Sequence, residues 1–296
     1  MATNDPVFIL GVGAQKSGTT WLYSYLRKHP DCAMSAEKEL GFFNVHFTEA
    51  DFPKAREVRL QRLVNSATRQ IRNIQQGKPK AESKALVALM DSIAMQFEPR
   101  RYMRHFKQMR ADHPNARLFG DITPEYAGLS ADNFRTIREW ITGAGFRPRV
   151  VYLMRDPVER CYSALRMADR NRKDDGGAIH RPARERLATE AVSHWCEVRT
   201  RYERTIPALE AAFGPDELYL GIYEDFFRTE VTQELCGFLD IPYVAPNFEH
   251  MANSSPRDSE PAAEDVATVR AFYSDTYDFC RERFGAERID RLWTAA

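Results

Sequence analysis

The sequence has few features of a secreted, membrane-embedded or nucleic-acid-binding protein. Its five cysteines are scattered over 296 residues and none belongs to a C-x-x-C pair, which argues against a disulfide framework or a zinc site. Lysine plus arginine (42) equals aspartate plus glutamate (42), so no net charge draws the chain to nucleic acid. No apolar run reaches membrane-spanning length, and the N-terminus has no signal-peptide pattern. We therefore expect a cytoplasmic protein without an integral membrane segment, whose basic site would have to be local.

Short apolar runs predict the buried strands of an α/β domain. Val7–Val12 is such a run, and Arg149–Met154 and Leu218–Tyr223 are two more; unbroken apolar runs of this length are typical of strands covered on both faces. Arg117–Gly120 predicts a fourth, shorter strand. Glycines follow the first run, and Thr19–Lys28 has the pattern of a helix after it, so the chain opens as an α/β unit.

Residues 52–110 differ from the rest of the chain. They are charged, mostly helical in pattern and without strand signals, and apolar residues that include Leu63, Val64 and Ala67 are spaced to share one helix face;. We interpret this segment as a helical insertion on an α/β core. The prediction is one domain that spans residues 1–296.

A glycine-bearing loop, Gly13-Ala-Gln-Lys-Ser-Gly-Thr-Thr20, separates the first predicted strand from its helix. The free N–H groups and the dipole of a helix start make an anion site, and Gly18 would let the backbone approach the anion closely. A nucleoside-triphosphatase loop reads G-x-x-x-x-G-K-S/T, but here Thr19 stands in the lysine position and Lys16 lies two residues before Gly18. A tight turn without a ligand remains the alternative.

The longer string Gln15-Lys-Ser-Gly-Thr-Thr-Trp21 resembles the 5′-phosphosulfate loop of sulfotransferases that use 3′-phosphoadenosine-5′-phosphosulfate (PAPS); the cytosolic branch of that family has a proline in place of Gln15. The resemblance implies an α/β fold of three layers, like that of P-loop nucleotide kinases, with a mainly parallel sheet between helices. It implies PAPS as sulfuryl donor, adenosine 3′,5′-bisphosphate (PAP) as product and no required metal. It also implies that the nucleotide is bound by Gln15, Lys16, Ser17, Gly18, Thr19, Thr20 and Trp21. In this family pattern the tryptophan stacks on the adenine, and we expect the lysine to stabilise the leaving group.

A second motif, Arg155-Asp-Pro-Val-Glu-Arg-Cys-Tyr-Ser163, follows the second predicted strand directly. An arginine at a strand end can grip a phosphate with a bidentate fork. The motif is similar to the family's 3′-phosphate site, which implies that Arg155 and Ser163 bind that phosphate; a helix cap with a surface ion pair is the alternative. Tyr219–Phe226 resembles the segment whose tyrosine lies near the adenine. That implies the same role for Tyr223, although a core aromatic explains it equally well.

The segment Ala36-Glu-Lys-Glu-Leu-Gly-Phe-Phe43 is similar to a motif of the heparan-type and related carbohydrate sulfotransferases. In those enzymes the glutamate after the lysine is the proposed general base, which implies that role for Glu39 and a contact of Lys38 with the sulfuryl oxygens. A solvated surface pair is the alternative. Cytosolic hormone and phenol sulfotransferases use a histidine instead, and His46 is the reserve candidate. Gly120–Tyr126 resembles a further segment of the carbohydrate branch, with aspartate in place of its glutamate, and is expected to line the acceptor side.

The C-terminal third departs most from the family. The basic, glycine-rich loop that covers the 3′-phosphate in the cytosolic branch is missing, and Ser255 and Arg257 in the polar stretch Asn253–Arg257 are the only substitutes we see. A plain polar loop is the alternative there.

These motifs together predict a sulfotransferase that moves the sulfuryl group of PAPS onto a hydroxyl or amine of a carbohydrate, glycolipid or small metabolite, by in-line displacement with Glu39 as base. Two alternatives remain open. A P-loop kinase or nucleotidase would share the core but require magnesium, and an idle nucleotide-binding scaffold would bind PAP without transfer. The sequence does not predict the oligomeric state.

Overall fold

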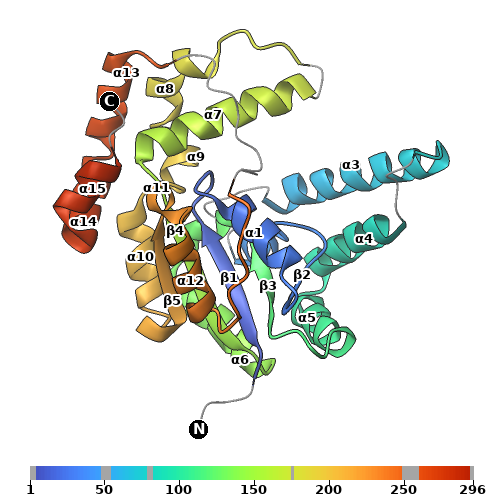
Figure 1. The fold of residues 1–296 in the computed structure, drawn as a ribbon. Helices are drawn as coiled ribbons and strands as arrows, with labels where there is room; N and C mark the ends of the chain where they lie inside the picture. Colours follow the sequence, from blue (N-terminus) through green and yellow to red (C-terminus); the bar gives the residue numbers. More distant parts are fainter. Residues whose placement is uncertain (1–4, 48–54, 79–82, 175–176, 249–259, 294–296) are drawn as a thin grey trace.

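The computed structural model describes residues 5–47, 55–78, 83–174, 177–248 and 260–293. Its centre is a five-stranded sheet in the order β2-β3-β1-β4-β5, in which every pairing is parallel (Figure 1). The strands are β1 (Val7–Gly13), β2 (Cys32–Met34), β3 (Leu118–Ile122), β4 (Arg147–Met154) and β5 (Leu218–Ile222). The predicted α/β class and all four predicted strands are confirmed.

Helices cover both faces of this sheet. Alternate residues of β1 point to opposite faces, so Phe8 and Leu10 belong to one core cluster and Val7 and Ile9 to another. On the face of Val7 lie α1 (Thr19–Lys28) and α12 (Thr229–Phe238). On the other face lie α5 (Arg100–Asp112), α6 (Ala131–Gly143), α7 (Pro157–Asp174), α10 (Tyr202–Glu210), α13 (Ala263–Phe272), α14 (Ser274–Phe284) and α15 (Ala286–Leu292). This is the expected arrangement of three layers.

Shorter elements connect these layers. They are α2 (Phe42–Phe47), η1 (Pro124–Gly128), η2 (Ala183–Glu185), α8 (Leu187–Glu190), α9 (His194–Glu197), η3 (Pro215–Glu217) and α11 (Tyr223–Phe226). None of the helices described here is both long and apolar enough to cross a membrane.

The region from 52 to 110 is helical, as expected, with α3 (Ala55–Gln75), α4 (Ser83–Phe97) and α5. In Figure 1, α3 and α4 lie side by side and project from the body of the molecule. They pack on each other through Leu63, Ala67 and Leu89. Val64 does not share this buried face, because it is 46% exposed; one residue advances a helix by about 100°. In contrast, α5 belongs to the main core.

The segment after β5 folds as two helices, although its sequence suggests one helix from Asp225 to Leu239. The break falls at Phe227 and Arg228, where Arg228 has an extended backbone (φ −132°, ψ 152°). The turn brings the ring of Phe227 edge-on to Trp21 and Tyr223. The break thus places an aromatic side chain at the end of the sheet where the loop between β1 and α1 lies.

Candidate functional site

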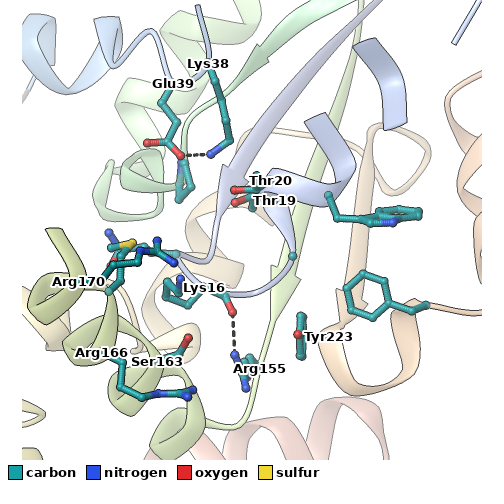
Figure 2. Close-up of a pocket in the computed structure, with 16 residues that line it drawn as sticks. Lys16, Thr19, Thr20, Lys38, Glu39, Arg155, Ser163, Arg166, Arg170 and Tyr223 are labelled. Atoms are coloured by element: carbon teal, nitrogen blue, oxygen red, sulfur yellow. Dashed lines mark hydrogen bonds and ion pairs between the residues drawn. The ribbon is translucent and has the colours of Figure 1, made fainter. Parts of the chain in front are cut away.

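A cavity of about 300 Å³ lies at the carboxyl ends of the strands, beside the loop between β1 and α1 (Figure 2). In parallel α/β sheets ligands bind at this edge, because the loops that follow the strands converge there. The cavity is lined by Gln15, Lys16, Gly18, Thr19, Thr20, Trp21, Lys38, Glu39, Pro124, Arg155, Ser163, Arg166, Met167, Arg170, Tyr223 and Phe227. The structure therefore brings together nine of the ten residues expected to bind nucleotide, and Glu39 with them.

The loop between β1 and α1 leaves a helix start open toward this cavity. Gly18 is the N-cap of α1 in the left-handed conformation (φ 90°), and no side chain caps the helix. The first N–H groups of an uncapped helix lack partners inside the helix, so they are available to an anion. A side chain at Gly18 would be strained, and its Cβ would come within 3.3 Å of the Phe227 and Tyr223 rings. The glycine is required by the turn and by this close approach.

Ser17 is the one expected ligand whose side chain does not line the cavity. It is fully buried, and its backbone N–H donates to the carbonyl of Ala14 at 3.2 Å. The loop turns at Lys16, which has positive φ (73°). This turn directs Lys16 toward the cavity and Ser17 into the protein.

Positive charge is concentrated at the cavity in a chain that is neutral overall. Its lining has one carboxylate, from Glu39, and five cations, from Lys16, Lys38, Arg155, Arg166 and Arg170. The pKa of Lys16 is lowered to about 8, chiefly by burial and in addition by the charges of Arg170, Arg155, Arg166 and Lys38. Such a pocket suits a ligand with several negative charges.

Arg155 sits where β4 ends and is fixed by contacts on three sides. Its guanidinium donates to the carbonyl of Lys16 and to Oε2 of Glu159, each at 3.2 Å, and lies 4.4 Å from the centroid of the Tyr223 ring. The Tyr202 hydroxyl donates to its backbone carbonyl at 2.7 Å. Nε of Arg155 is buried and has no hydrogen-bond partner among the described residues, so the side chain keeps a free donor.

Asp156 and Ser163 extend this site along α7. Asp156 Oδ1 accepts from the backbone N–H of Val158 at 2.8 Å and from the hydroxyl of Tyr277 at 2.9 Å, so it caps the helix as its position before Pro157 predicts. Ser163 lies on the face of α7 that lines the cavity. This cap fixes the start of α7 relative to the end of β4.

Arg166 and Arg170 are cavity residues that the motifs did not identify. Together with Ser163 they are spaced at i, i+3 and i+7 on α7, which places them on one helix face, and Figure 2 shows all three toward the cavity. The spacing was visible in the sequence. It becomes informative only once α7 is known to pass the loop after β1, and the same holds for Phe227.

The two aromatic residues expected near adenine have different surroundings. Trp21 lines the cavity, but it is only 6% exposed and its ring stacks on Tyr25 (5.4 Å between centroids) and on Phe248 (5.8 Å). Tyr223 lies between Arg155 and Phe227, whose ring meets it edge-on at 5.1 Å. Tyr223 and Phe227 are both partly exposed and therefore offer the more open aromatic surface.

Lys38 and Glu39 form an ion pair at the far end of the cavity, above Thr19 and Thr20 in Figure 2. Glu39 has positive φ (60°), so the backbone is turned sharply at this position. The pair lines the same cavity as Lys16. A carboxylate and two ammonium groups thus line one cavity.

Asp121 holds the chain that follows Glu39. Its carboxylate accepts from the N–H of Leu40 at 3.3 Å, from the Thr123 hydroxyl at 3.0 Å and from the Tyr126 hydroxyl at 2.6 Å. The hydroxyl of Thr123 in turn accepts from the N–H of Gly41, and that of Tyr126 from the N–H of Phe42. The segment 120–126 was expected to line the acceptor side. Three of its residues, Asp121, Thr123 and Tyr126, anchor the loop that carries Glu39, and Pro124 lines the cavity.

His46 is not part of this cavity. It lies on α2, stacks on Phe42 at 5.6 Å and lines a separate pocket with Met103 and Trp140. Burial lowers its pKa. The stretch Asn253–Arg257, with Ser255 and Arg257, lies outside the described residues.

Comparison with known proteins agrees with this geometry. Residues 6–245 match the sulfotransferase family, and the chain belongs to that family. A sulfotransferase from Alicyclobacillus acidocaldarius has the same fold, with a TM-score of 0.56 at 19% identity over 98% of this chain and 96% of that one. The sulfotransferase domain of the curacin biosynthetic pathway aligns with a TM-score of 0.45 at 18% identity, over 81% and 75% of the two chains.

One curated relative, the membrane-associated sulfotransferase kil1 of Dictyostelium discoideum, is 36% identical over 69 residues. The match covers 21% of this chain and only 14% of that protein. It supports the family assignment. A match over so short a segment does not assign the activity of that relative to this chain.

Proposed function

We propose that this protein transfers the sulfuryl group of PAPS to a hydroxyl or amine of a carbohydrate, glycolipid or small metabolite. The observation that carries the proposal is the meeting, in one cavity, of an open helix start, Lys16, the Arg155–Tyr223 pair and the Lys38–Glu39 pair. Family membership supports the reaction type. The donor, the residue roles and the acceptor class are inferred from the site.

The donor fits the groups that the cavity offers. Two buried polar atoms that line it, Oε1 of Gln15 and Nε of Arg155, have no partner among the described residues. A nucleotide with two phosphates would give the Nε donor of Arg155 an acceptor, and a hydroxyl or amino group of the nucleotide would donate to the Gln15 oxygen. The N–H groups at the start of α1 would hold the 5′-phosphate with Thr19 and Thr20. Arg155 and Ser163 would hold the 3′-phosphate, and Tyr223 would contact the adenine.

Lys16 would stabilise the charge that grows on the leaving oxygen. Its ammonium lies beside the loop amides in a partly buried site, where a fixed cation acts more strongly than in water. Arg166 and Arg170 add positive charge on the same side. Lys38 would contact the sulfuryl oxygens.

Glu39 would take the proton of the acceptor. In the transfer step the acceptor oxygen forms a new bond to sulfur, the bond from sulfur to the phosphate oxygen of the donor breaks, and the acceptor proton moves to the Glu39 carboxylate. The electron pair of the broken bond stays with the phosphate of PAP. Asp121 anchors the loop after Glu39. The position of the base would therefore depend on Asp121 and not on the residues that bind the nucleotide.

The test is transfer of radiolabel from ³⁵S-PAPS to a panel of carbohydrate, glycolipid and phenolic acceptors, with and without EDTA. We expect labelled product that persists in EDTA and is lost in Lys16→Ala. No labelled product from PAPS, together with magnesium-dependent phosphoryl transfer from ATP, would favour the kinase alternative. Binding of PAP with no labelled product on any acceptor would favour the scaffold alternative.

A further inference from the structure

Two arginines of α3, Arg59 and Arg62, lie at the Glu39 end of the site. A Cβ built on Gly41, two residues after Glu39, would lie 3.4 Å from Nε of Arg59. Both arginines act electrostatically on Glu125 of η1, and Glu39 acts on the same carboxyl. The three side chains therefore share Glu125 as a neighbour. Since α3 belongs to the pair of helices that projects from the body (Figure 1), this helix reaches the site only through its N-terminal half.

Neither arginine has an ionic partner in the described part of the chain. Nε and one Nη of Arg59 are buried donors without a hydrogen-bond acceptor among the described residues. Neither arginine forms an ion pair with a neighbouring carboxylate there. Two of those carboxylates are engaged elsewhere, since Glu39 pairs with Lys38 and Glu125 lies 3.9 Å from Arg199. A third, Glu37, acts electrostatically with Arg59 but forms no ion pair with it among the described residues. A partly buried guanidinium with unused donors is costly unless a ligand supplies the acceptors.

The two arginines lie outside the nucleotide cavity, so we assign them to the acceptor and not to the nucleotide. The cavity reaches from Tyr223 to Glu39, and neither Arg59 nor Arg62 lines it. The acceptor must approach Glu39 from the side that the nucleotide leaves free. The two arginines lie outside the cavity, next to Gly41 and Glu125, and Arg62 is exposed. Arg199, which also faces Glu125, lies 4.8 Å from the ring of the exposed Trp195.

On this basis, which rests on the function proposed above, we propose that the acceptor carries an anionic oxyacid group, a carboxylate or a phosphate, that Arg59 and Arg62 bind while the reacting hydroxyl reaches Glu39. Planar guanidinium groups one helical turn apart match the paired oxygens of such a group. Arg69 and Arg72, further along the same helix, are exposed and begin about 10 Å beyond Arg62 along the helix axis. They are the matched control, because they carry the same charge on the same helix but lie farther from Glu39.

The experiment compares acceptors that differ only in charge. Purified protein is given ³⁵S-PAPS and either 4-nitrophenyl β-glucoside or 4-nitrophenyl β-glucuronide, and in a second arm either glucose or glucose 6-phosphate. Binding of each compound to the PAP-loaded protein is measured in parallel by calorimetry. We expect the anionic acceptor of at least one pair to have a kcat/KM about tenfold or more above that of its neutral counterpart, as charge-assisted hydrogen bonds imply. The arm that shows the preference distinguishes carboxylate from phosphate.

In the double variant Arg59→Gln/Arg62→Gln, kcat/KM for the anionic acceptor divided by kcat/KM for the neutral one should fall toward one. The change should lie in KM for the anionic acceptor, and the affinity for PAP should be unchanged. Arg69→Gln/Arg72→Gln removes the same charge and should keep the preference. The proposal is overturned if the neutral members are preferred, if both double variants behave alike, or if no anionic member binds or is labelled. Failure of the unaltered protein to bind PAP would instead overturn the proposed function, so the two failures are distinct.

Discussion

The guanidinium of Arg155 lies over the ring of Tyr223, 4.4 Å from its centroid, and donates to the carbonyl of Lys16 in the phosphate loop. One side chain thus joins the ends of β4 and β5 to the loop after β1. A planar guanidinium is needed for this, because an ammonium cannot stack and donate in two directions at once.

Arg155→Lys should therefore weaken PAP binding although it keeps the charge. We expect a loss of about ten- to hundredfold, since two charge-assisted hydrogen bonds and the stacking contact are disturbed. Titration calorimetry with PAP measures it. Arg172→Lys, an exposed change on α7, is the control, and equal affinity of Arg155→Lys and the unaltered protein would show that Arg155 is only a structural residue.

We expect the cationic form of Lys16 to set an alkaline limit to activity. Its pKa is lowered to about 8, chiefly by burial, so in the free protein the side chain is charged below that pH and loses its proton above it. We expect kcat/KM for PAPS to fall as the pH rises through about 8. Lys16→Ala should lower kcat by about 10²–10³-fold, and a flat profile up to pH 10 would contradict the role.

Arg170 should shift that limit, because among the like charges it lowers the Lys16 pKa most. Removing a positive neighbour makes protonation of Lys16 easier, so Arg170→Gln should move the alkaline fall to higher pH while weakening PAP binding. The pH profile of kcat/KM is the measurement. Arg172→Gln, on the same helix but outside the cavity, should leave the profile in place; a shift toward lower pH in Arg170→Gln would reverse the predicted sign.

Glu39→Gln should bind PAP normally and lose about 10²–10⁴-fold in rate, the usual contribution of a general base. His46→Gln tests the reserve base and should retain transfer, because His46 lines a different pocket. Calorimetry for PAP and a label-transfer assay together separate binding from chemistry. Weak PAP binding by Glu39→Gln would make Glu39 structural, and loss of transfer by His46→Gln would return the histidine to the mechanism.

The core of the fold was predictable because each signal was local. A continuous apolar run such as Val7–Val12 has few alternatives to a buried strand, and the helix Thr19–Lys28 begins and ends where its pattern indicates. The break at Phe227 was not predictable, because the local pattern continues through it and the ring is held by contacts with Trp21 and Tyr223. Tertiary packing overrides helical propensity there.

The site was predictable wherever a motif fixes chain geometry, and not where helices meet. The loop after β1 and Arg155 stand at strand ends, and parallel strands bring those ends together. The burial of the Ser17 side chain was not predictable, because it follows from the left-handed turn at Lys16. Arg166 and Arg170 depend on how α7 crosses the loop, which only the packed structure reveals.

The most direct test of the central claim is a crystal structure of the protein with PAP. The account predicts the 5′-phosphate at the start of α1 beside Lys16, the 3′-phosphate at Arg155 and Ser163, and the adenine against Tyr223. PAP bound elsewhere on the molecule, with the Lys16 cavity empty, would contradict it.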